Sequence, residues 1–151
     1  PSRRPAYGAT PRLRVIAGPH ARAFSAATRA TLLTAEYQVG TQSNRMGYRL
    51  AGPSLAASPG TTVPSLGVMA GVIQVPPGGE PILLMADAQT TGGYPIIATV
   101  IGADLPLAAQ LLPGDTVRFA AVPLHEAHAA LAAQRALLVA PPDDDNIGAP
   151  I

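Results

Sequence analysis

The stretch that decides the fold is Gly71-Val72-Ile73-Gln74-Val75-Pro76-Pro77-Gly78-Gly79-Glu80-Pro81-Ile82-Leu83-Leu84-Met85-Ala86. Two short apolar runs, 72–75 and 82–86, flank a segment that consists almost entirely of Pro and Gly. Apolar runs of this length on either side of turn-forming residues predict a β-hairpin, here with a loop longer than the tightest class. The centre of the chain is therefore expected to be β-sheet.

Further short strands are expected on both sides of this hairpin. Their apolar or alternating patterns lie at 13–16, 36–39, 48–50, 96–101 and 116–122. Helical patterns lie at 20–33, 105–111 and 123–138. Between 51 and 70 the chain is rich in Gly, Pro, Ser and Thr, which predicts no regular structure. Because strands and helices do not alternate as in a doubly wound fold, we expect a mainly β chain, an antiparallel barrel or sandwich with two or three peripheral helices.

The length of 151 residues fits one ordinary domain. Residues 1–11 contain three prolines and predict a linker or flexible start. Residues 12–140 are expected to form the domain itself. Residues 141–151 include the acidic run 143–145 between prolines and a glycine, which predicts a flexible acidic tail.

Missing residue types exclude several kinds of chemistry. The chain has no Cys, so a disulfide framework, a thiol nucleophile and a Cys-based zinc site are excluded. All ten basic residues are Arg. Without Lys, the chain cannot form a P-loop or a Schiff base from its own residues.

Charge and hydropathy also bear on possible partners. The first 49 residues carry a net charge of +7 and the rest −6, which we interpret as solvated charge rather than a binding surface. No basic stripe is interleaved with aromatics, so we expect no nucleic-acid partner. No apolar run approaches the length of a membrane span, and no apolar segment follows Arg3 and Arg4 as in a signal peptide. A cytoplasmic protein without a membrane partner is expected.

Two polar, glycine-containing segments interrupt this alanine-rich chain, Ser43–Leu50 and Asp87–Pro95. Glycines allow backbone to approach a ligand closely, and binding residues concentrate on such loops. Arg45 can bind a carboxylate or phosphate with two hydrogen bonds, or Arg45 and Arg49 can form the exposed face of a strand end. The segment 89–94 can form a nest of backbone N–H groups for an anion, or an ordinary long loop.

Three other motifs are interpreted as structural. His125 and His128 lie three residues apart on a predicted helix, whereas the zincin motif needs a spacing of four, so two surface histidines and no metal site are expected. Residues 52–56 end in Ala where a nucleophile elbow needs Gly. His20 follows Gly-Pro and is expected at the start of the first helix, without a catalytic role.

Several longer motifs occur in a fixed order along most of the chain. They are Ala17-Gly18-Pro19-His20, Tyr37-Gln38-Val39, Ser43-Asn44-Arg45-Met46-Gly47-Tyr48-Arg49-Leu50, Gly52-Pro53, Gly71-Val72-Ile73-Gln74-Val75-Pro76, Ala86-Asp87, Gln89-Thr90-Thr91-Gly92-Gly93-Tyr94-Pro95, Ile97-Ala98-Thr99-Val100, Ala103-Asp104-Leu105, Pro113-Gly114-Asp115 and Glu126-Ala127. In this order they resemble the C-terminal half of the allophanate hydrolase subunit 2 family, also described as urea amidolyase-related or biotin-dependent carboxyltransferase-like. That family includes the C subunit of the bacterial 5-oxoprolinase and the anti-inhibitor of a sporulation kinase.

The resemblance implies a cyclophilin-like β-barrel that forms part of an ATP-dependent complex and opens a cyclic amide, such as 5-oxoproline to glutamate. Two alternatives stay open. One is a carboxyltransferase domain related to urea carboxylase, with biotin as cofactor. The other is a regulatory partner of a kinase-inhibitor-like protein, without enzymatic activity. Family members are about twice as long, so the isolated domain is expected to be inactive.

The same resemblance implies a set of partners and a binding cleft. The expected partners are the N-terminal half of the same protein, a chain like allophanate hydrolase subunit 1 (the B subunit of 5-oxoprolinase) and a lactam-utilisation chain, with ATP in the complex though not necessarily in this domain. No catalytic residue is assigned. The residues expected to line the cleft are Asn44, Arg45, Tyr48, Gln74, Gln89, Thr90, Thr91, Gly92, Gly93 and Tyr94.

Overall fold

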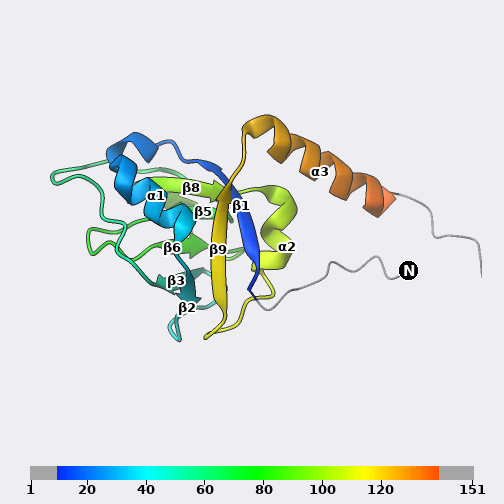
Figure 1. Ribbon diagram of the computed structural model, residues 1–151, viewed down its shortest axis with the longest axis horizontal. Coiled ribbons are helices and arrows are strands. Elements are labelled where there is room, and N and C mark those ends of the chain that lie inside the picture. Colours follow the sequence, from blue (N-terminus) through cyan, green and yellow to red (C-terminus); the bar gives the residue numbers. More distant parts are fainter. Residues whose placement is uncertain (1–9, 140–151) are drawn as a thin grey trace, which may run out of the picture.

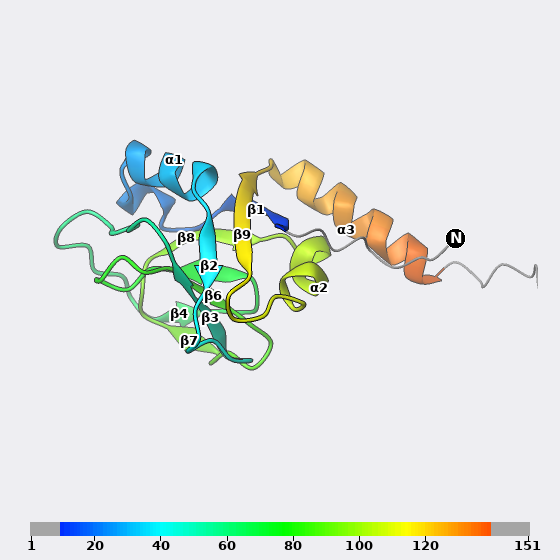
Figure 2. The same cartoon turned by 60° about the horizontal axis from the view of Figure 1, so that its bottom comes forward.

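The computed structural model describes residues 10–139, in which seven strands close into a barrel and two further strands form a small separate sheet (Figures 1 and 2). Around the barrel the order is β1-β8-β5-β6-β3-β2-β9, and every pair is antiparallel except β1 with β9, which closes the barrel. The strands are β1 (Arg12–Ala17), β2 (Tyr37–Val39), β3 (Gly47–Ala51), β4 (Leu66–Gly67), β5 (Val72–Gln74), β6 (Ile82–Leu84), β7 (Thr91–Gly92), β8 (Ile96–Val100) and β9 (Thr116–Ala121).

Three α-helices and two 3-10 turns complete these described residues. The helices are α1 (Ala26–Thr34), α2 (Leu105–Ala108) and α3 (Leu124–Val139), and the turns are η1 (Ala21–Ala23) and η2 (Gly102–Asp104). Of the barrel and the sandwich, the barrel is observed, with the expected peripheral helices. Because α3 alone has 16 residues, the chain is mixed α/β, and the expectation of a mainly β chain understates its helices. Residues 1–9 of the predicted flexible start 1–11, and the whole of the predicted acidic tail 141–151, lie outside the described residues.

The hairpin prediction is confirmed by the pairing of β5 with β6, in which Ile73 lies opposite Leu83. The turn between them uses Gly79, whose φ of +83° lies in the left-handed region that favours glycine. A Cβ at this position would also collide with the Oγ of Ser54. The Gly79 carbonyl accepts a hydrogen bond of 2.8 Å from Leu55 N–H, so the turn also holds the long loop that follows β3.

The first predicted helix is wrong over its first turns. Instead of one helix over 20–33, the chain forms η1, breaks at Ser25, and begins α1 at Ala26. The Ser25 hydroxyl accepts a hydrogen bond of 3.0 Å from Thr28 N–H, which is N-cap geometry. A serine that caps a helix must stand outside it, and this local preference overrides the apolar periodicity around it.

The small sheet of β4 and β7 has no counterpart among the predicted strands. β4 lies within 51–70, and β7 lies inside the second polar segment, with Leu66 opposite Gly92. Strands of two residues carry no readable alternation, so the sequence offers no periodic signal for them. Their pairing nevertheless places the polar segment against the outside of the barrel, beside β3 and β6 (Figure 2).

Two apolar clusters occupy opposite faces of the β5–β6–β8 wall. The interior of the barrel contains Ile73, Leu83 and Ile97, together with Tyr37, whose ring lies 6.1 Å from that of Phe119. The outer apolar layer, as we call it, consists of buried Val72, Leu84 and Ile96 packed against Leu66, Val68, Ile82 and Ala88. It is this outer layer that joins the small sheet to the barrel.

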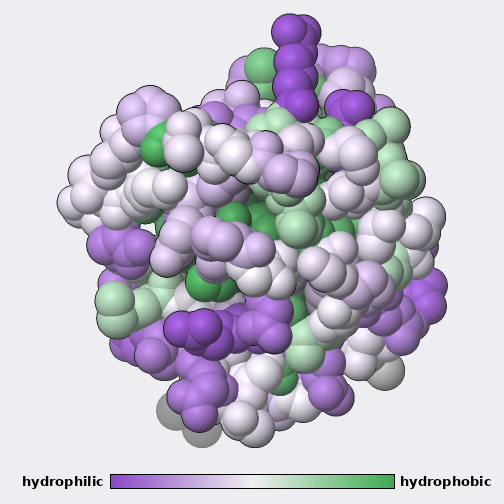
Figure 3. Space-filling view, turned by 90° about the vertical axis from the view of Figure 1, so that its left-hand side faces the viewer, coloured by the Kyte–Doolittle hydropathy of each residue, from purple (hydrophilic) through white to green (hydrophobic). Residues whose placement is uncertain are grey.

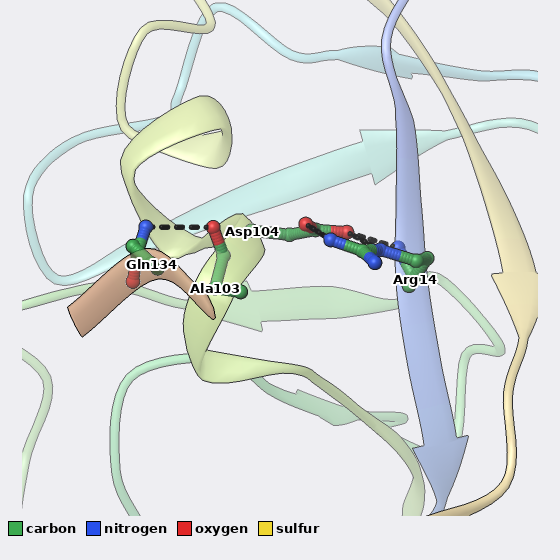
Figure 4. A network of polar contacts seen from close by, with 4 residues as sticks. All are labelled: Arg14, Ala103, Asp104 and Gln134. Carbon is green, nitrogen blue, oxygen red and sulfur yellow. Dashed lines mark hydrogen bonds and ion pairs between the residues drawn. The ribbon is translucent and has the colours of Figure 1, made fainter. Parts of the chain in front are cut away.

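An ion pair between a buried carboxylate and a half-exposed arginine fixes the turn that precedes α2. Asp104 is 6% exposed and accepts hydrogen bonds from Arg14 N–H at 2.7 Å and from the Arg14 guanidinium at 2.6 and 3.0 Å (Figure 4). The side-chain hydrogen bond to Asp104 raises the pKa of Arg14. Next to it, Gln134 of α3 donates to the Ala103 carbonyl at 3.1 Å. From this contact α3 extends away from the barrel (Figure 1).

Among residues 10–139 none of the helices combines the length and the hydrophobicity that a membrane span requires.

Candidate binding cavity on the outer face of the barrel

A polar cavity of about 400 Å³ lies at the edge of the outer apolar layer. Ile82 and Leu84 of β6 supply its apolar wall. The polar lining residues are Gln42, Asn44, Arg49, Gln74, Gln89 and Tyr94. Within the described lining the only charged group is the Arg49 guanidinium, so the cavity suits an anion that also carries hydrogen-bonding groups.

Strand register explains why Arg49 and Gln74 face the same cavity. Ile82 is the pairing partner of Arg49 on one side and of Gln74 on the other. Residues directly opposite each other in neighbouring strands project to the same face of a sheet. Three side chains from β3, β6 and β5 therefore form one row, with cation and carboxamide at its two ends and an isoleucine between them.

Gln74 is an unusual residue for a buried strand position. Its side chain is 3% exposed, and within residues 10–139 its Oε1 has no hydrogen-bond partner. An added Cβ at Gly92 would lie 3.0 Å from this oxygen, so β7 covers it closely. Leaving a buried acceptor without a partner costs about 1–3 kcal/mol, and such groups call for an explanation.

The structure brings together four of the sequence-predicted site residues, Asn44, Gln74, Gln89 and Tyr94, in this cavity. Gly92 lies against Gln74 without being among the lining residues. Thr90, Thr91 and Gly93 are exposed on or beside β7. The side chain of Asn44 is already engaged, because its Oδ1 accepts a hydrogen bond of 2.8 Å from Met46 N–H in a local turn.

Arg45 and Tyr48 are placed elsewhere. Together with Asn44 they line a second cavity of about 460 Å³, whose other walls come from Met85 and the segment after α2. Arg45 is paired with Asp87, with 2.8 Å between its Nε and Oδ2, and both side chains are largely exposed. Among residues 10–139 Arg45 thus has a carboxylate partner, whereas Arg49 has none.

Alternation along β3 accounts for the position of Tyr48. Its side chain packs against the barrel interior, whereas its neighbour Arg49 points outward. Burial raises the pKa of the Tyr48 phenol, so the hydroxyl stays protonated near neutral pH. The two residues, adjacent in sequence, therefore belong to different faces of the same strand.

The anion nest considered for 89–94 is not formed. Thr91 and Gly92 are extended and paired in β7, and neither Gly92 nor Gly93 has a positive φ. A nest requires successive N–H groups turned to one side by alternating helical-type conformations, which an extended strand does not provide. Of the two interpretations of this segment, the structure favours the loop, with a short strand inside it.

Arg49 is a lining residue that the sequence motifs do not single out as a ligand. They place it only at an exposed strand end, although the pattern Tyr48-Arg49-Leu50 alternates apolar and charged residues. That alternation separates Arg49 from Tyr48 and is the signal that could have placed it on the outer face. Gln42 is also missed, and no sequence signal distinguishes it, because it precedes the strand in a turn.

The other titratable residues between 10 and 139 do not form the pattern of a metal site. In the part of the chain that the structure describes, no three His, Cys, Asp or Glu side chains come together as metal ligands would. His125 and His128 are both exposed on α3, as expected. The His20 ring instead accepts a hydrogen bond of 3.0 Å from Ile96 N–H, and its side chain makes no helix-capping bond.

The face at the left-hand end of Figure 1 has several hollows (Figure 3). Figure 3 shows the most hydrophobic side chains there mostly in recesses, between pale and hydrophilic ones. A smaller cavity of about 170 Å³ between the long loop and the hairpin turn shares Tyr94 with the polar cavity. Among the cavities of residues 10–139, the polar cavity combines a cation with a buried polar group that has no partner.

Residues 1–121 match the family model described as carboxyltransferase domain, subdomain A and B. The chain belongs to this family. The match ends just before α3, so it includes the whole barrel and every residue of the polar cavity.

Two curated relatives of this carboxyltransferase-domain chain are named as the C subunit of 5-oxoprolinase. The relative from Escherichia coli is 44% identical over 116 residues, which are 77% of this chain and 37% of the relative. The relative from Haemophilus influenzae is 51% identical over 92 residues, 61% of this chain and 30% of the relative. The chain thus spans about a third of the length of the curated relatives it matches.

Solved structures show the same fold. The Kluyveromyces lactis urea carboxylase superimposes with a TM-score of 0.79 at 25% identity, over 89% of this chain and 13% of that one. The K. lactis urea amidolyase gives the same TM-score and identity, over 89% of this chain and 9% of its own. The carboxyltransferase-domain fold is therefore shared by proteins with different names, and the identity of the curated relatives is the more informative guide.

Proposed function

We propose that this chain is a substrate-binding domain of a 5-oxoprolinase complex, in the role of its C subunit, and that the polar cavity holds 5-oxoproline. The observation that carries this proposal is the 44–51% identity to two proteins named as that subunit. The likeness to the urea-processing enzymes is lower, at 25% identity. As part of the same proposal, the closed barrel and its peripheral helices are assigned to the cyclophilin-like fold.

The chemistry fits a domain that binds rather than one that supplies every reacting group. Opening 5-oxoproline breaks the lactam C–N bond with the addition of one water, and the released nitrogen becomes an ammonium group. A second water hydrolyses ATP to ADP and phosphate, which drives the reaction. The described lining of the polar cavity has no carboxylate and no histidine, so ATP and the catalytic groups are assigned to the rest of the complex.

The substrate has two features that the cavity can bind. Its carboxylate pairs with the Arg49 guanidinium, a charge-assisted contact of the strong class. Its ring methylenes lie against Ile82 and Leu84. Gln89 and Tyr94 lie at the exposed side of the cavity and are proposed to contact the ligand there. Arg45 and Tyr48 line the second cavity, outside this site, and the exposed residues of β7 are proposed to face the partner segments.

The proposed partners follow from the length of the relatives. The N-terminal part of the full-length protein is proposed to complete the cavity, and the lactam-utilisation chain and the chain like allophanate hydrolase subunit 1 to bind next to it. A carboxyltransferase related to urea carboxylase is the second candidate. It is favoured by the family model and by the TM-score of 0.79, and it requires biotin attached outside these 151 residues, because they contain no Lys.

ADP release by the complex that contains this chain tests the proposal. The complex is assayed with 5-oxoproline and ATP, and again with urea, bicarbonate, ATP, a biotin carboxylase and a biotinylated carrier. Release that depends on 5-oxoproline and on the presence of this chain supports the 5-oxoprolinase role. Release that depends on urea and biotin replaces it with the carboxyltransferase. An assembled complex that is inactive with both overturns both and favours the regulatory alternative.

A further inference from the structure

We propose that the Gln74 carboxamide determines the specificity of the polar cavity by pairing with the N–H and C=O edge of a cyclic amide, while Arg49 binds the carboxylate of the same ligand. This inference rests on the proposed function for the identity of the ligand, 5-oxoproline. Its physical basis is independent of that name, because it starts from a buried polar group without a partner among the described residues.

The position of Gln74 is the first argument. The neighbouring outward-facing residues of this wall, Val72, Ile82 and Ile96, are all apolar. A glutamine at 3% exposure among them, with an acceptor that no described residue satisfies, is costly for folding alone. Buried polar groups retained at such a cost are typical of binding sites, where the ligand supplies the missing partner.

The chemistry of the carboxamide is the second argument. A primary amide has an acceptor oxygen and two N–H donors on one flat group. A lactam has an N–H and a C=O held on the same side of its ring, so the two groups can form two parallel hydrogen bonds. The terminal torsion of glutamine is soft, and the oxygen now covered by Gly92 can turn toward the cavity without a change of backbone.

Spacing is the third argument. Gln74 and Arg49 lie two strands apart in one row, so their Cα atoms are separated by about 10 Å. Both side chains line the cavity together with Ile82, and their length can bridge this separation to a small ring that bears a carboxylate. Among residues 10–139 no carboxylate is paired with Arg49, so its guanidinium is available to an anionic ligand.

Two fragments of the ligand separate the two roles. 2-Pyrrolidinone has the amide edge without the carboxylate, and cyclopentanecarboxylate has the carboxylate without the amide edge. Each is titrated into the complex by NMR and, where 5-oxoproline supports turnover, used as a competitive inhibitor. The variants are Gln74→Leu, which keeps the side-chain volume, and Arg49→Met, with Arg45→Met as the matched control.

The inference predicts a crossed result. Gln74→Leu raises the dissociation constant of 2-pyrrolidinone about tenfold or more and changes that of cyclopentanecarboxylate by less than about twofold. Arg49→Met has the opposite pattern, with the large effect on cyclopentanecarboxylate. For 5-oxoproline both variants raise KM with a smaller effect on kcat. Equal effects of Gln74→Leu on both fragments, or no effect on 2-pyrrolidinone, overturn the inference.

The two proposals fail separately. If the complex shows no turnover of 5-oxoproline but the crossed binding pattern holds, the proposed function is wrong and the role of Gln74 stands for another cyclic amide or ureide. If turnover is present and Gln74→Leu leaves both KM and 2-pyrrolidinone binding unchanged, the function stands and the role of Gln74 is wrong. Circular dichroism of each variant excludes loss of fold as the cause.

Discussion

Arg49 and Gln74 are both register partners of Ile82, one on each side of β6, and they face the same cavity from opposite ends of a single cross-strand row. The other polar lining residues come from the segments around β3 and β7, which are far apart in sequence. They meet because β3 pairs with β6 and the small sheet packs on the outer face of the same wall. The shared register partner Ile82 therefore places a cation and a carboxamide on one face of the barrel wall, where each can be substituted separately.

The contact between Gly92 and Gln74 predicts a strong effect of a single methyl group. In Gly92→Ala the new Cβ would lie 3.0 Å from Gln74 Oε1 and 3.3 Å from Val68, so the carboxamide must shift. We expect ligand affinity to fall by about tenfold, measured as the dissociation constant of 2-pyrrolidinone.

Gly67→Ala is the matched control for that variant. It adds the same methyl group to the other strand of the small sheet, where the nearest atom is the Thr90 carbonyl oxygen at 3.9 Å. Its binding should be unchanged within about twofold. Equal losses in both variants would show that the sheet as a whole, and not the carboxamide, is responsible.

Gln74→Leu should stabilise the folded chain while it impairs binding. The substitution removes a buried acceptor that lacks a partner in the described residues, and it keeps a similar volume among apolar neighbours. The free energy of unfolding should rise by about 1–3 kcal/mol, measured by urea denaturation. A decrease would mean that the carboxamide stabilises the fold.

Arg14 should contribute more to stability than the other paired arginines. Arg14→Met leaves the Asp104 carboxylate, 6% exposed, without its guanidinium, and we expect the free energy of unfolding to fall by about 2–4 kcal/mol. In Arg118→Met the lost partner is Glu36, whose side chain is half exposed, so the loss should stay under about 1 kcal/mol. Equal losses in the two variants would contradict this assignment.

Tyr37 should make the fold sensitive to alkali. Burial raises its pKa to about 12, so the unfolded chain loses this proton at lower pH than the folded chain does. The stabilisation is present below about pH 10 and is lost as pH rises toward 12. In urea denaturation at about pH 9 and about pH 11, Tyr37→Phe should show a smaller decrease in stability between the two than the wild type.

Particular residues show how far sequence reasoning reaches. The hairpin at 72–86 and the last helix could be placed because apolar periodicity and Pro-Gly punctuation are local signals. Ser25 and the two-residue strands could not, since a helix cap and a short pairing depend on hydrogen bonds that leave little periodic trace. Tertiary pairing, and not propensity, decides such elements.

The sequence predicted several residues of the candidate site, but it did not predict how the fold arranges them in space. Motif position selects Gln74, Gln89 and Tyr94, which the fold does bring together. It also selects Arg45, whose partner Asp87 lies 42 residues further along the chain. It does not select Arg49, because the row that gives this side chain its place exists only after β3 has paired with β6.

The comparison of Arg45 with Arg49 is the most direct test of the central claim. ADP release is measured as a function of 5-oxoproline concentration for the complex containing the wild-type chain, Arg49→Met or Arg45→Met. The account predicts a KM raised by about tenfold or more in Arg49→Met and a nearly unchanged KM in Arg45→Met. A raised KM in Arg45→Met beside an unchanged Arg49→Met would contradict it and place the substrate in the second cavity.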